Sequence, residues 1–198
     1  MTEHKDLRNL VIFFSGRGSN MQAIFEQVEH GVLRDVARVP FVVTNNPEAG
    51  GIGVAAAFGV QTRILPSKGM PRAEYDATLL RTLDGEGVDV IALAGFMRIL
   101  TPVFISAYRG RVVNVHPADT AAHQGLDGYT WAFEQRLSET FVTVHVVDEG
   151  LDTGPVLRKA RVDLAGANSL AEVEARGLAV EHRVYSEALR DFLMGVKE

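Results

Sequence analysis

The first part of the chain repeats one pattern, in which short apolar runs alternate with longer amphipathic segments. Runs without polar alternation are typical of strands that are covered on both faces. These runs occupy residues 10–14, 39–43, 61–65, 88–93 and 111–115. The segments between them have helical spacing and occupy residues 21–29, 52–58, 72–84 and 102–108. The alternation predicts an α/β fold with a doubly wound, mostly parallel, Rossmann-like sheet.

The pattern changes after residue 125. Residues 129–137 have helical spacing, whereas residues 141–147 and 156–162 read as strands that flank the turn-rich stretch DEGLDTGP. This arrangement predicts an antiparallel strand pair near the C-terminus. Ser169 followed by Glu172 resembles a capping box, which predicts a long last helix that reaches about residue 194. With no linker or repeat in view, we expect one domain over residues 1–198.

Composition narrows the class of protein. The 198 residues carry a net charge of −5 and no dense basic cluster, which disfavours nucleic acid as a partner. The chain has no cysteine, which excludes disulfides and thiolate chemistry. The charged N-terminal stretch lacks the apolar run of a signal peptide, and no run approaches the roughly 20 apolar residues of a membrane span. We therefore expect a cytoplasmic protein that acts on small molecules, as a monomer or a homodimer.

The first loop, SGRGSN at residues 15–20, follows the first strand directly and opens a helix. Its glycines allow a close backbone approach, and the free N–H groups of a helix start attract anions. The loop lacks the third glycine of a dinucleotide fingerprint and the lysine of a Walker loop, so it suits a single phosphate better. A plain glycine-rich turn is the alternative interpretation.

Two further strand ends carry candidate chemistry, and ligands of open α/β sheets bind at such ends. The stretch LAGFMRIL at residues 93–100 offers an apolar slot and free backbone groups for a flat heterocycle. Asn114 and His116 end the fifth strand, and because side chains alternate they point the same way. An amide donor beside an imidazole suits acyl transfer, although a satisfied core pair is the alternative. Residues 148–155 contain carboxylates, and one that lay near His116 would favour the imidazolium form of this ring. The alternative interpretation of residues 148–155 is an acidic turn exposed to solvent.

Taken together, four stretches resemble the phosphoribosylglycinamide formyltransferase family, which consists of folate-dependent formyltransferases. These stretches are SGRGSNMQAI, LAGFMRIL, NVHP and LDTGP, and their order and spacing match from about residue 8 to residue 190. The resemblance implies transfer of a formyl group from 10-formyltetrahydrofolate to the amine of glycinamide ribonucleotide, without a metal. It also implies a phosphate-binding half at about residues 8–100 and a folate-binding, catalytic half at about residues 101–195.

The resemblance also implies roles for individual residues. The substrate-binding residues implied are Gly18, Ser19, Asn20 and Glu181, the first three for the phosphate and Glu181 for the ribose hydroxyls. The donor-binding residues implied are Arg72 for the glutamate tail, Met97, Arg98, Ile99 and Leu100 for the pterin, and Asn114. The catalytic residues implied are Asn114, protonated His116 and Asp152.

This sequence departs from the family pattern on the side of the acceptor amine. Residues 118–125 read ADTAAHQG in place of a more apolar segment, Phe141 replaces a small residue, and Leu178 stands where a polar residue is common. The alternatives are therefore a paralogue that formylates another small amine, or a folate-binding protein without catalysis. By alternation, we expect His145 to serve packing, and we expect His123 to lie in an exposed loop.

Overall fold

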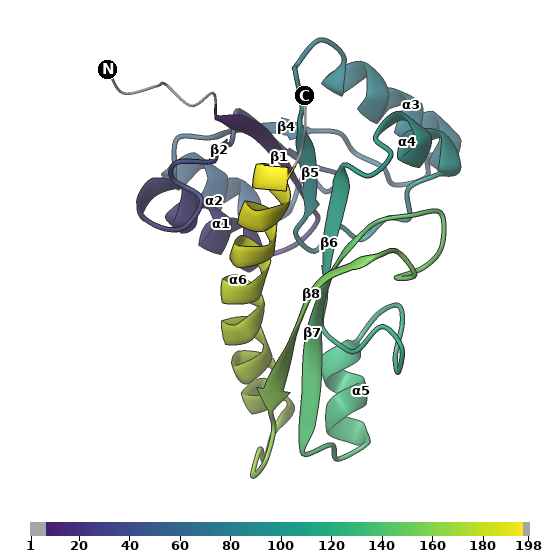
Figure 1. The fold of residues 1–198 in the computed structure, drawn as a ribbon. Helices are drawn as coiled ribbons and strands as arrows, with labels where there is room; N and C mark the ends of the chain where they lie inside the picture. Colours follow the sequence, from purple (N-terminus) through teal and green to yellow (C-terminus); the bar gives the residue numbers. More distant parts are fainter. Residues whose placement is uncertain (1–6, 196–198) are drawn as a thin grey trace.

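The computed structural model describes residues 7–195, which form one mixed sheet with helices on both sides (Figure 1). The strands are β1 (Arg8–Phe14), β2 (Ala37–Arg38), β3 (Phe41–Thr44), β4 (Gln61–Ile64), β5 (Val90–Leu93), β6 (Val112–His116), β7 (Glu139–Val146) and β8 (Val156–Asp163). The helices are α1 (Ser19–His30), α2 (Gly51–Ala57), α3 (Arg72–Leu83), α4 (Pro102–Ala107), α5 (Gly128–Glu134) and α6 (Leu170–Gly195). The strand order is β4-β3-β1-β5-β6-β7-β8, and β2 pairs with β1 outside this path.

The sheet changes direction at β7. Strands β1 to β6 run parallel, whereas β7 runs antiparallel to β6 and β8 runs antiparallel to β7. The predicted fold class and the predicted antiparallel pair near the C-terminus are confirmed. Because β7 returns alongside β6, residues from the middle of β7 lie beside the carboxyl end of β6.

Two hydrophobic cores cover the two faces of the sheet. The alternate residues Leu10, Ile12 and Phe14 of β1 join the core that includes residues of α1, α2, α5 and α6. The intervening residues Val11 and Phe13 join the core formed with α3 and α4. The same period of two governs β6, so the sheet fixes which of its side chains can reach the functional edge.

The predicted helices and strands are all present, with small shifts at their ends. The sequence pattern missed β2, because a pair of residues is too short for a periodic signal. At the start of α6, the backbone N–H of Glu172 donates to Ser169 Oγ (3.2 Å), as in the predicted capping box. The Glu172 carboxylate, however, accepts from the backbone N–H of Asn168 (3.0 Å) and not from that of Ser169.

The loop between β7 and β8 has a fixed shape. Asp148 Oδ1 accepts from Thr153 Oγ1 (2.7 Å) and from the Gly150 N–H (3.0 Å), which closes a compact turn. A Cβ at Gly154 would lie 1.8 Å from the carbonyl oxygen of Val146, so this position requires glycine. The turn presents Asp152, whose φ of 52° is in the left-handed region.

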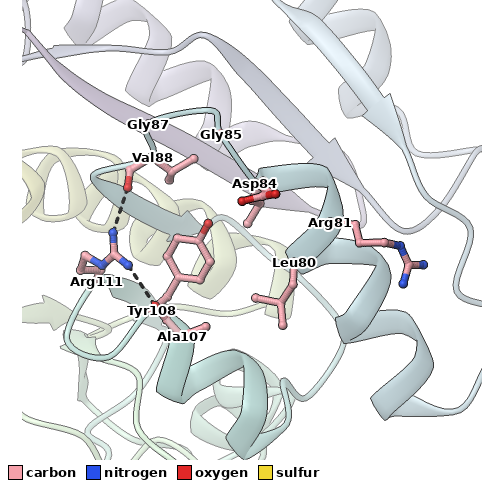
Figure 2. A pocket seen from close by; sticks show the side chains of 10 residues that line it. Leu80, Arg81, Asp84, Gly85, Gly87, Val88, Ala107, Tyr108 and Arg111 are labelled. Carbon is pink, nitrogen blue, oxygen red and sulfur yellow. Dashed lines mark hydrogen bonds between the residues drawn. The ribbon is translucent and has the colours of Figure 1, made fainter.

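A groove of about 560 Å³ lies at the amino ends of β5 and β6, away from the strand ends that carry the candidate chemistry. Figure 2 shows Tyr108 and Asp84 facing this groove, with Arg111 at its edge. The Arg111 guanidinium donates to the carbonyl oxygens of Val88 (3.1 Å) and Ala107 (2.9 Å), which ties α4 to the start of β5. Within the described residues, no helix is long and apolar enough to cross a membrane.

Candidate active site

Asn114 and His116 occupy the carboxyl end of β6 and project from the same face. Val113 and Val115, which alternate with them, belong to the core on the opposite face. His116 is 3% exposed, whereas Asn114 is half-buried. The strand therefore presents an amide and an imidazole together at one edge of the sheet.

The loop between β7 and β8 brings Asp152 to these two residues. Its Oδ2 lies 3.4 Å from His116 Nδ1, and its Oδ1 lies 3.5 Å from Asn114 Nδ2. The backbone N–H of Gly125 donates to Asp152 Oδ2 at 2.8 Å and anchors the carboxylate. Asp152, which is distant in the sequence, thus joins Asn114 and His116 in one cluster, although the catalytic role of the three residues stays a prediction.

His145 also belongs to this cluster, which sequence alternation alone did not indicate. It lies directly across from Asn114 in the β6–β7 ladder and is 2% exposed. Its Nε2 lies 3.3 Å from Asp152 Oδ1 and 3.3 Å from Asn114 Nδ2. Its burial fits the expected inward orientation, and its ring also makes polar contacts that the expectation of packing did not include. The register of the antiparallel β6–β7 pair would have revealed this contact, because it places His145 opposite Asn114.

Burial and charge set the protonation states of the cluster. Burial lowers the pKa of His116 below its usual value, and the nearby Asp152 carboxylate only partly opposes this effect. Burial acts to raise the pKa of Asp152, but hydrogen bonds from His145 and Gly125 outweigh it, so this pKa is lowered. The free site therefore favours a neutral imidazole beside an ionised carboxylate at neutral pH. The effect of a nearby carboxylate, which the sequence suggested, is present, but desolvation outweighs it.

The loop at residues 118–125 packs closely against the site. Two of its polar side chains have partners, since Lys159 Nζ lies 2.5 Å from Asp119 Oδ2, and the ring of His123 stacks on Trp131 at 4.7 Å between centroids. His123 is therefore half-buried and not an exposed loop residue as expected. Its carbonyl oxygen lies 2.9 Å from His116 Nε2, a contact that fixes the plane of the imidazole.

The donor-binding segment predicted at residues 97–100 follows β5. Met97 is 64% exposed and Ile99 is 53% exposed, while Leu100 is buried beneath them. The guanidinium of Arg98 turns away and donates to the carbonyl oxygens of Ser67 (3.2 Å) and Met70 (2.7 Å). The segment thus offers an apolar surface, and the Arg98 side chain serves the neighbouring loop.

Arg72 begins α3 directly after the loop at residues 65–71 that Arg98 holds. The guanidinium of Arg98 also lies over the ring of the buried Tyr75, 4.6 Å from its centroid. Arg72 itself is exposed. The structure links Arg72 to the segment at residues 97–100 through this loop and does not bring it into the cluster of Asn114, His116 and Asp152.

The predicted substrate residues Asn20 and Glu181 meet on the other side of the site. Asn20 Nδ2 donates to Glu181 Oε2 at 2.6 Å, and Gly18 and Ser19 form the start of α1 beside them. Glu181 is 5% exposed, and burial raises its pKa although hydrogen bonds from Asn20 and Tyr129 oppose this rise. The hydroxyl of Tyr129 donates to Glu181 Oε1, which sequence reasoning missed because Tyr129 reads simply as the start of a helix.

Comparison with known proteins agrees with this fold. The formyl transferase family profile matches residues 8–189. The chain belongs to the formyl transferase family.

Named relatives give a finer comparison. The sequence is 35% identical to phosphoribosylglycinamide formyltransferase of Escherichia coli, in a match that covers 94% of this chain and 88% of the relative. It is 34% identical to the trifunctional purine biosynthetic protein adenosine-3 of Drosophila melanogaster, where the match covers 95% of this chain but 14% of the relative. The crystal structure of glycinamide ribonucleotide transformylase 1 from Geobacillus kaustophilus superposes with a TM-score of 0.88 at 40% identity, covering 94% of this chain and 99% of that chain.

Proposed function

We propose that this protein transfers the formyl group of 10-formyltetrahydrofolate to the amine of glycinamide ribonucleotide, a step of purine biosynthesis. The observation that carries the proposal is the cluster of Asn114, His116 and Asp152 in a chain of the formyl transferase family. The names of the Escherichia coli and Geobacillus kaustophilus relatives support glycinamide ribonucleotide as the acceptor.

The donor binds along the segment at residues 97–100 in this proposal. The exposed side chains of Met97 and Ile99 suit the flat face of a pterin, and the main chain of Arg98 can recognise its polar edge. Arg72, exposed at the start of α3, attracts the carboxylates of the glutamate tail. Asn114 completes the donor site at the formyl group.

The acceptor binds between α1 and α6. Its phosphate lies at the start of α1, where the backbone N–H groups of Gly18, Ser19 and Asn20 face an anion. Glu181 accepts hydrogen bonds from the ribose hydroxyls. The hydrogen bond between Asn20 and Glu181 supports this assignment, because it joins the two predicted parts of the acceptor site.

The chemistry is a direct acyl transfer. The amine nitrogen bonds to the formyl carbon while the π pair of the C=O bond moves onto the oxygen. The amine nitrogen then loses a proton, the C=O bond reforms, and N10 of the folate leaves with a proton. The products are a formamide and tetrahydrofolate, so the step balances without a metal or a covalent enzyme intermediate.

The cluster stabilises the charge that develops on the formyl oxygen. Asn114 Nδ2 donates to this oxygen, and the Nε2–H of His116 donates to it in place of the His123 carbonyl oxygen, which lies 2.9 Å from Nε2 in this structure. The proton that the amine loses passes through Asp152 to Nδ1 of the neutral His116 ring, and the ionised Asp152 beside Nδ1 stabilises the imidazolium that forms. The imidazolium gives this proton up to N10 of the folate as N10 leaves.

The test is formyl transfer by the purified chain, followed by mass spectrometry of the ribonucleotide product. The variant His116→Ala should lower kcat at least about a hundredfold, since loss of an oxyanion donor has effects of that size. His30→Ala is the matched control, because His30 is exposed at the end of α1. Near-normal turnover by His116→Ala would refute the catalytic assignment.

The same assay separates the alternatives. Transfer to another small amine, with none to glycinamide ribonucleotide, would indicate the paralogue, and tetrahydrofolate binding without transfer to any amine would indicate a binding protein. The single domain over residues 1–198, the monomeric or homodimeric state and the cytoplasmic location stay predictions.

A further inference from the structure

Three polar side chains connect the separate loops at the carboxyl edge of the sheet. Ser15 follows β1, Asn45 follows β3, and Ser67 lies in the loop between β4 and α3. The Ser15 hydroxyl donates to Asn45 Oδ1 at 2.6 Å, and Asn45 Nδ2 donates to Ser67 Oγ at 3.1 Å. We call this chain of Ser15, Asn45 and Ser67 the polar strut.

The strut meets the donor-binding segment at both ends. At one end, the backbone N–H of Met97 donates to Ser15 Oγ at 2.8 Å. At the other end, the carbonyl oxygen of Ser67 accepts from the Arg98 guanidinium, which also holds Met70. The segment and the loop before Arg72 are therefore bonded to one polar chain.

The strut also meets the acceptor loop, because Ser15 is the first residue of SGRGSN. The backbone N–H of Ser15 donates to the carbonyl oxygen of Gly95 (3.1 Å), and its carbonyl oxygen accepts from Asn46 Nδ2 (3.2 Å). Ser15 thus binds the strand end before the donor segment through its main chain as well as its side chain.

The three side chains of the strut are largely shielded from water. Ser15 and Ser67 are buried and Asn45 is half-buried, so a hydrogen bond that is lost here is not readily replaced by water. The strands themselves do not require these side chains, since their backbone ladders are complete without them. The strut instead joins loops, and the loops carry the residues assigned to the donor and the acceptor.

We propose that Ser15, Asn45 and Ser67 are positioning residues that hold the donor-binding and acceptor-binding loops in one relative position, so that the affinities for both substrates depend on the strut. This inference rests on the proposed function. Asn45 is the central member, because it donates to one serine and accepts from the other.

The experiment measures KM for each substrate and kcat in Asn45→Ala and Ser67→Ala. Asn45→Ala should raise both KM values about threefold to tenfold, the effect of one or two ordinary hydrogen bonds, with kcat within about threefold of the parent. Ser67→Ala should raise the KM of the donor alone, because it cuts the strut beyond Asn45. Ser186→Ala is the matched control, since this buried serine bonds within α6, away from the strut.

The outcomes separate the strut from the proposed function. A lower melting temperature with both KM values unchanged, or a rise of one KM alone in Asn45→Ala, would overturn the strut. If Asn45→Ala does not fold, the donor-selective effect of Ser67→Ala decides. If the parent protein transfers no formyl group, the proposed function fails. Calorimetry with tetrahydrofolate and with glycinamide ribonucleotide then tests the strut through the affinities of the variants. If neither ligand binds the parent protein, the strut proposal fails as well.

Discussion

His145 and Asn114 face each other across β6 and β7, with 3.3 Å between Nε2 and Nδ2. The same imidazole nitrogen lies 3.3 Å from Asp152 Oδ1, and when it carries a hydrogen it donates to this carboxylate, so His145 supports Asp152 and lies beside the Asn114 amide. The site therefore extends from the carboxyl end of β6 to His145, near the carboxyl end of β7.

We expect His145→Ala to lower kcat by roughly tenfold to a hundredfold, the effect of losing a hydrogen bond to a charged group. Because His145 helps to lower the pKa of Asp152, its removal raises that pKa and moves the acidic limb of the kcat profile to higher pH. The measurement is kcat against pH. His145→Gln keeps an N–H donor and should restore part of the loss, whereas an unmoved acidic limb would contradict this role.

Stability should depend on pH through His116. Its pKa in the folded protein lies below the value of 6.5 for the free side chain, so below pH 6.5 the unfolded chain binds the proton more strongly. The unfolding free energy should be highest above pH 6.5 and should decrease as the pH falls from there toward the folded pKa. His116→Gln should flatten this decrease in urea unfolding.

The pKa of His182 is also lowered by burial, so part of the decrease should persist in His116→Gln and disappear in the double variant with His182→Gln. His30→Gln, at an exposed position, serves as the control. An unchanged pH dependence in both variants would show that neither ring is desolvated as described.

Tyr129→Phe should reduce the unfolding free energy by about 1–3 kcal/mol at neutral pH, because Glu181 Oε1 loses a buried donor. Without this donor the pKa of Glu181 rises further, since the Tyr129 hydroxyl opposes the effect of burial. The loss should therefore be smaller at acidic pH, where the carboxyl is neutral. Urea unfolding at both pH values tests this, with Tyr108→Phe at the opposite groove as the control. Equal losses at the two pH values would point to packing alone.

Gly154→Ala should lower kcat at least about tenfold, because the new Cβ would displace the turn that presents Asp152, and a small misplacement of a reacting group is costly. Gly53→Ala is a matched change in α2, where a Cβ has open space, and should leave kcat unchanged. Steady-state kinetics of the two variants, with circular dichroism to verify folding, make the comparison. Equal kcat values would mean that the turn adapts.

The fold was accessible from sequence because its signals are local. Alternate residues of 10–14 enter the two cores, as expected for a strand covered on both faces. Ser169 and Glu172 identify the start of α6. The alignment of Asn114 with His116 also follows from strand geometry alone. These features need no knowledge of distant contacts.

The rest of the site depends on contacts between distant segments. The position of Asp152 depends on a turn set by Asp148 and Gly154, and the place of His145 depends on register. The neutral state of His116 depends on how deeply the folded chain buries it. The bond between Tyr129 and Glu181 joins residues from two helices that no local pattern relates.

The loop at residues 118–125 meets His116 and Asp152 through main-chain atoms, the carbonyl oxygen of His123 and the N–H of Gly125. Backbone groups are the same whatever side chain they carry, so substitutions along this loop can preserve both contacts. Gly125 is more constrained, because its φ of 88° favours glycine. The sequence of this loop can therefore diverge while both contacts persist, and a chain that reads ADTAAHQG here can keep His116 and Asp152 in place.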